Sequence, residues 1–148
     1  MITIKNSVKN ITLSNQWVKE VAQKIMDLLE YSDYDLGIWL TNNETIHRYN
    51  RDYRGKDKPT DILSFPYHPQ LQPGQRIAPQ EDEDKNLGDI IISLEYVVQA
   101  AQELGVPLQE RMKVLLVHGI CHLLGYDHIK DEDFVVMDKQ EQWLLKKI

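Results

Sequence analysis

Apolar residues recur along this chain with the two periods that distinguish helices from strands. Spacings of three and four residues indicate helices, whereas short apolar or alternating runs indicate strands. Strands are expected within residues 1–13 and over residues 34–41, 62–65 and 87–93. Helices are expected from Ser14 to about Leu29 and over residues 42–51, 94–104, 107–124 and 131–147.

Particular residue types mark the ends of several of these helices. Ser14 can accept a hydrogen bond at the start of the first helix, and Gly105 is placed to end the third. The acidic run at residues 131–133 is expected to start the last helix, because negative side chains stabilise the positive N-terminal end of a helix dipole. The positions expected to be buried on that last helix are Phe134, Met137, Trp143 and either Leu144 or Leu145.

The segment before the last expected strand lacks regular apolar spacing. Four of the chain's six prolines lie in residues 66–79, and an acidic run follows at 81–84. Because proline fixes φ and removes a backbone donor, it interrupts helices and strands alike. We expect a long exposed loop here.

The mixed order of strands and helices, with a helical C-terminal half, predicts an α+β fold. The whole chain, residues 1–148, is expected to form one domain in which a small mixed sheet is covered by helices. Residues 114–124 are apolar nearly all round the expected helix, so that helix should be central and buried.

Composition narrows the class of protein. With 42% hydrophobic and 27% charged residues, the chain is typical of globular domains, and no apolar run approaches the ~18 residues of a membrane span. The lone Cys121 fits a reducing compartment and the N-terminus lacks a signal-peptide core, so a cytoplasmic location is expected. The net charge of −6 means that contact with nucleic acid must rely on a local basic patch.

Three of the five histidines fall in one segment, HGICHLLGYDH, at residues 118–128. His118 and His122 are four residues apart on the expected helix, so both imidazoles project from one face and can bind one metal ion. Gly125 is placed to end the helix in a left-handed cap, after which His128 can return to the same ion. Three imidazoles suit one Zn²⁺ per chain and leave a fourth position for water, as in catalytic zinc sites.

The spacing of these histidines is that of the metzincin proteases, which indicates a zincin-like fold with the ligands on the central helix. Those enzymes carry a glutamate directly after the first histidine as general base, and here that position is Gly119. A metal site is therefore expected, whereas peptidase chemistry is doubtful.

A basic cluster lies upstream of the histidines. Residues 48–58 carry five basic and two acidic side chains, a net of +3, with interleaved tyrosines. Arginine offers a planar fork of donors to phosphate oxygens, and tyrosine offers a surface for base stacking. By itself the cluster is weak evidence for RNA contact, because a charged helix end would look the same.

Three segments together resemble a known family. They are YNRDYRGKDKPTDILSFP (49–66), LGDIIIS (87–93) and HGICHLLGYDH (118–128), and their order and spacing are similar to those of the YbeY family of bacterial metal-dependent endoribonucleases. The resemblance implies that His118, His122 and His128 bind zinc and that Arg54 takes part in activity. It also implies a single-stranded RNA substrate and a role in ribosomal RNA maturation and ribosome quality control.

Zinc lowers the pKa of its bound water from about 9 toward about 7, which would supply a hydroxide nucleophile at neutral pH. Zinc and Arg54 would then neutralise charge developing on the phosphoryl oxygens. Alternatively, zinc activates the RNA 2′-hydroxyl, and the residues do not separate these routes.

Two other functions stay open from the residues alone. One is a non-catalytic ribosome-assembly factor with a structural zinc, called here a zinc staple. The ion would only hold the C-terminal bend together, and a fourth protein ligand such as Cys121 would complete its coordination. The other is a zinc peptidase, against which Gly119 is the main argument.

Several further polar residues have a structural and a functional interpretation. Cys121 is expected to be a small core residue, and His68 a solvent-exposed loop residue. Asp127 either orients a histidine or caps the next turn. Asp61 and Asp89 are expected to fix loops through backbone N–H groups.

Overall fold

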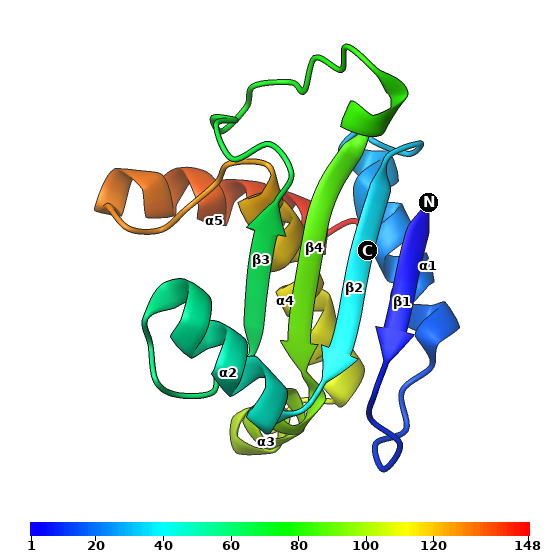
Figure 1. The fold of residues 1–148 in the computed structure, drawn as a ribbon, viewed down its shortest axis with the longest axis vertical. Helices are drawn as coiled ribbons and strands as arrows, with labels where there is room; N and C mark the ends of the chain where they lie inside the picture. The colour runs from blue at the N-terminus through cyan, green and yellow to red at the C-terminus, as the bar shows by residue number, and fades with distance from the viewer.

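A computed structural model describes all residues, 1–148, and its centre is a four-stranded mixed sheet (Figure 1). The strands are β1 (Ile2–Asn6), β2 (Asp35–Thr41), β3 (Ile62–Pro66) and β4 (Asn86–Ser93), in the spatial order β1-β2-β4-β3. The first three in that order run parallel, and the edge strand β3 is antiparallel to β4.

The helices cover the two faces of the sheet unequally. They are α1 (Asn15–Leu28), α2 (Asn43–Arg54), α3 (Leu94–Leu104), α4 (Leu108–Leu123) and α5 (Asp131–Leu145). α1 and α4 pack on one face of the sheet and form the main hydrophobic core with it. Figure 1 views the sheet from its other face, so α4 lies behind the strands. α2 packs on the other face through a small cluster of Ile46, Leu63 and Ile91.

The predicted α+β fold, with its small mixed sheet and central buried helix, is confirmed. Side chains of neighbouring residues along β3 and β4 point to opposite faces of the sheet. The two strands therefore contribute both to the main core and to the small cluster under α2. Ile62 and Ile90 face the main core, whereas Leu63 and Ile91 face α2.

Most helix ends lie where the sequence places them. The Ser14 hydroxyl accepts a hydrogen bond from the Trp17 amide at 3.1 Å, and Gly105 ends α3 at φ 68°. α2 continues to Arg54, beyond the predicted end near Arg51, and is stopped by Gly55 at φ 68°. Because Tyr53 is the only apolar residue of its last turn, apolar spacing could not reveal this extension.

The proline-rich segment is the long, mostly exposed loop that the sequence predicts, but two of its residues attach it to the rest of the domain. Ile77 is buried, and its amide donates to the Tyr31 hydroxyl at 3.1 Å. Arg76 donates to the carbonyl oxygens of Leu29 and Glu30, at 2.7 and 2.9 Å, and its guanidinium lies 4.0 Å from the Tyr31 ring centroid. One arginine and one isoleucine therefore attach this loop to the end of α1.

On α5 the prediction of buried residues is wrong in part. Met137 and Leu144 are buried, but Phe134 is 56% exposed and Trp143 is 44% exposed. α5 packs mainly against α4, so only a narrow stripe of it is covered. Met137 and Leu144 are seven residues apart, about two helical turns, and so share that stripe.

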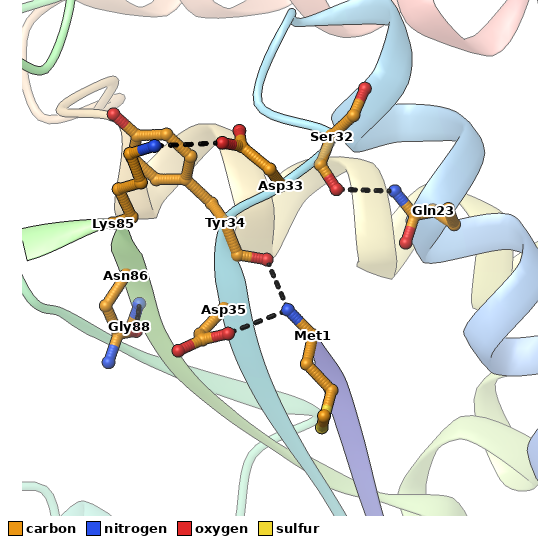
Figure 2. Close-up of polar contacts among 9 residues, drawn as sticks. All are labelled: Met1, Gln23, Ser32, Asp33, Tyr34, Asp35, Lys85, Asn86 and Gly88. Atoms are coloured by element: carbon orange, nitrogen blue, oxygen red, sulfur yellow. Dashed lines mark hydrogen bonds and ion pairs between the residues drawn. The ribbon is translucent and has the colours of Figure 1, made fainter. Parts of the chain in front are cut away.

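The segment before β2 is fixed by polar contacts (Figure 2). The Met1 amino group contacts the Tyr34 carbonyl oxygen at 2.9 Å and the Asp35 carboxylate at 2.7 Å. The Lys85 ammonium lies 3.1 Å from the Asp33 carboxylate and lowers the pKa of that carboxyl. These contacts join the starts of β1, β2 and β4.

None of the helices combines the length and apolar character needed to cross a lipid bilayer.

Gly125, just after α4, provides a test of the turn that redirects the chain. It has φ 95°, and a Cβ there would overlap the Leu71 carbonyl oxygen. We expect Gly125→Ala to lower the free energy of unfolding by about 2–3 kcal/mol, measured by urea denaturation. Gly105→Ala is the matched control, because Gly105 also has positive φ but nothing lies within 4 Å of its Cβ position. An equal loss in the two variants would contradict the steric part of this account.

Candidate metal centre

Two of the three predicted histidines occupy the last turns of α4. His118 and His122 project from the same side of the helix, and their Nε2 atoms are 3.0 Å apart. Each side chain is half-buried, whereas the opposite side of α4 is packed into the main core. The four-residue spacing thus produces the paired imidazoles that the sequence predicts.

The third histidine reaches the pair because the chain turns back after α4. Gly125 takes the positive φ that the turn requires, and His128 is stacked on His118 with ring centroids 5.4 Å apart. One nitrogen from each of the three rings lies within 4.8 Å of the others. The structure therefore brings together His118, His122 and His128 as a group that can hold one metal ion.

A carboxylate that sequence analysis missed orients the first histidine. Glu141 Oε2 lies 2.9 Å from His118 Nδ1, and the Glu141 side chain is only 17% exposed. Since a carboxylate only accepts, His118 Nδ1 is the donor in this contact, and Nε2 is the nitrogen that faces the neighbouring histidine. Glu141 stands on α5, 23 residues away, and no local spacing connects it with His118.

Burial keeps the middle histidine neutral. Removal from water, together with the neighbouring rings of His118 and His128, lowers the pKa of His122 to about 4. A neutral imidazole is the form that binds a metal, so this ring needs no deprotonation at neutral pH.

The donor set fits a tetrahedral metal ion. Two nitrogens bound to one zinc at about 2.1 Å lie about 3.4 Å apart, close to the 3.0 Å between the two Nε2 atoms. Cys121 does not belong to the group. It is fully buried in the main core, and burial raises the pKa of its thiol to about 12, which disfavours the thiolate that metals bind. The core role expected for Cys121 is confirmed.

Gly119 shows why the position after the first histidine carries no side chain. A Cβ there would lie 2.8 Å from Ile62 Cδ1 and 2.9 Å from Ile90 Cδ1. The helix therefore lies directly against β3 and β4 at the position where metzincins carry their glutamate. A glutamate there would push the ends of these two isoleucine side chains aside and begin its side chain in an apolar contact.

Arg54 stands apart from the histidines along the chain and in the fold. It is the last residue of α2 and is exposed, and α2 and α4 pack on opposite faces of the edge strand β3. Its guanidinium forms none of the ion pairs in the structure. The expected chemistry has Arg54 and a zinc ion act on the same phosphoryl group, and this stays a prediction.

Three of the remaining candidates, Asp127, Asp61 and His68, have structural partners. Asp127 accepts from the Ile129 amide at 3.3 Å, which is the turn-capping role. Asp61 accepts from the Ile62 amide at 2.8 Å and pairs with Arg111 at 3.6 Å. His68 is half-buried rather than exposed, since its Nε2 donates to the Asp84 carbonyl oxygen at 2.7 Å.

Comparisons with known proteins point to one family. The family model described as endoribonuclease YbeY matches residues 2–148. A relative with that name from Sulfurihydrogenibium is 38% identical over 148 residues, covering 99% of this chain and 91% of that protein. A human protein of the same name is 31% identical, covering 99% of this chain and 87% of its own.

A solved structure supports the fold. The solution structure of a protein from Thermotoga maritima matches with a TM-score of 0.59 and 23% identity, covering 99% of this chain and 91% of that one. The family model extends the resemblance of the three sequence segments to nearly the whole chain. With a family model that matches 147 of 148 positions, this chain belongs to the YbeY endoribonuclease family.

Proposed function

We propose that this protein is a zinc-dependent endoribonuclease that cuts single-stranded RNA, in a single domain spanning residues 1–148. The convergence of His118, His122 and His128 on one point carries the proposal, because three imidazole nitrogens there provide a catalytic type of metal site. Family membership supports the reaction class. The expected role is ribosomal RNA maturation and ribosome quality control in the cytoplasm.

The residues of the chain have separate tasks in this reaction. The three histidines would hold one ion, and Glu141 would keep the His118 ring turned toward it. When bound, a zinc ion supplies Lewis-acid chemistry, because it withdraws charge from a phosphoryl oxygen and makes a hydroxyl group more acidic. Arg54 would bind a phosphate through its planar fork of donors. Water and the RNA 2′-hydroxyl are both compatible as nucleophiles.

The two alternatives are less well supported. A zinc staple would use a fourth protein ligand, and the group of histidines includes neither Cys121 nor another side chain. A peptidase of the metzincin type would need a general base after His118, where Gly119 packs against the sheet. Both observations favour the nuclease.

The metal site has a direct chemical test. We expect elemental analysis to find one zinc ion per chain and X-ray absorption to find nitrogen or oxygen neighbours near ~2.1 Å with no sulfur. His122→Ala should lose the bound ion while Cys121→Ala keeps it. Sulfur in the zinc coordination sphere would favour the staple function instead.

Glu141 has a predicted effect on metal affinity. Glu141→Gln keeps the size of the side chain but weakens the contact with His118, so zinc affinity should fall about 10- to 100-fold. A competition titration with a chromophoric chelator measures this. Glu132→Gln on the same helix is the matched control, because Glu132 is exposed and should leave affinity unchanged. Equal affinities of the two variants would show that Glu141 does not orient the ligand.

Arg54 is tested by cleavage of single-stranded RNA. Arg54→Lys keeps the charge but loses the two-pronged contact, so the rate should fall about 100- to 1000-fold with zinc content unchanged. Arg51→Lys, one turn earlier on the same helix, should have little effect. A fully active Arg54→Lys protein would make Arg54 an ordinary surface residue.

A further inference from the structure

The face of the sheet turned away from the metal centre carries a groove of about 700 Å³. α2 covers only one end of this face, and Figure 1 shows the strands from this side. The volume is within the range of small-molecule sites in proteins. Nothing in the proposed chemistry of the three histidines uses this groove.

Strand register explains the shape of the groove floor. Thr3, Gly37, Asp89 and Phe65 stand in one row across the four strands, in that order. Gly37 has no side chain, and the Asp89 carboxylate lies over it, where a Cβ of residue 37 would otherwise be. The sheet is therefore hollow at its centre, with a carboxylate at the bottom.

Asp89 has no structural partner, contrary to the loop-fixing role expected from the sequence. Its carboxylate takes part in none of the ion pairs of the structure and is exposed to the groove. By contrast, Asp35 at the end of the groove contacts the Met1 amino group (Figure 2). Asp89 is thus a free acceptor of hydrogen bonds.

One side of the groove is a chain of aromatic rings. Trp39 meets Tyr49 edge-on at 5.8 Å, Tyr49 stacks on Tyr53 at 5.8 Å, and Tyr53 meets Phe65 edge-on at 5.5 Å. The Tyr53 side chain is 69% exposed, although it packs against two other rings. Exposed, rigidly supported rings of this kind are the stacking surfaces that unpaired bases use.

The rim beside these rings carries arginines of α2. Arg48 lies 5.8 Å from the centroid of Tyr49, and Arg54 directly follows Tyr53 in the chain. Neither side chain forms an ion pair. Phosphates would be attracted to this rim and repelled by the Asp89 carboxylate, so a bound strand would place a base in the groove and its backbone on α2.

We propose that this groove binds an unpaired guanine of the RNA substrate, which rests on the proposed function. The base stacks on the Tyr53 side of the groove and donates its N1–H and N2–H groups to the two oxygens of Asp89. Among the RNA bases, only guanine presents two adjacent N–H donors on its Watson–Crick edge, and a carboxylate is an acceptor only. Asp89 would therefore be a specificity-determining residue that acts at a distance from the metal centre.

Equilibrium binding separates this proposal from catalysis. Fluorescence anisotropy is measured on the full chain in the presence of a chelator, with labelled single-stranded ten-nucleotide RNAs of A and U that contain one guanine or none. The protein should bind the guanine-containing RNA about tenfold more tightly. Asp89→Asn should abolish this preference, and Tyr53→Ala should weaken binding of both RNAs about 5-fold or more.

The control is Asp138→Asn, an exposed carboxylate on α5 that should keep the full preference for guanine. Thermal melting checks that each variant is folded. An unchanged preference in Asp89→Asn, or no preference in the unmodified protein, would overturn the proposal. The second result is also what a protein-docking surface on this face would give.

The same proteins, loaded with zinc, distinguish a failure of the proposed function. If guanine is preferred and Asp89→Asn removes that preference, but no RNA is cleaved, then the groove is a base-binding site and the nuclease proposal fails. If RNA is cleaved with no dependence on guanine or on Asp89, the nuclease stands and the groove proposal is overturned.

Discussion

The close contact between α4 and the sheet at Gly119 is the constraint on which the candidate site depends. Without a side chain at that position, the helix can lie directly against Ile62 and Ile90. Gly119 lies one residue after His118 and three before His122, so both histidines stand on the helix beside this contact. The position of the candidate metal site relative to the sheet therefore follows from how closely α4 packs there.

Two more contacts complete the site from outside α4. The positive φ of Gly125 lets the chain turn sharply enough for His128 to come back beside His118. The packing of α5 on α4 brings the Glu141 carboxylate to Nδ1 of His118. The site is thus assembled from α4, the turn after it and α5, which favours a site that is already arranged before any ion binds.

Those parts of the site that depend on neighbouring residues could be predicted from sequence. The spacing of His118 and His122 and the glycine at the bend are local features, and so are the caps at Ser14 and Gly105. Glu141 could not be predicted, because its contact depends on how two helices pack. The groove depends on strand register, which places Asp89 beside Gly37 and Phe65 although these residues are far apart in the chain. Burial on α5 was mispredicted at Phe134 because apolar spacing does not tell how much of a helix its neighbours cover.

The edge strand β3 separates the histidines from the basic and aromatic surface of α2, since α4 and α2 pack on its two faces.

The central claim is that the three histidines hold the one ion that makes this protein a nuclease. Its most direct test is to titrate zinc into chelator-stripped protein while cleavage of a single-stranded RNA is followed. Activity should rise in proportion to added zinc and stop rising at one equivalent per chain. Cleavage that is undiminished in the stripped protein and unaffected by zinc would contradict the account.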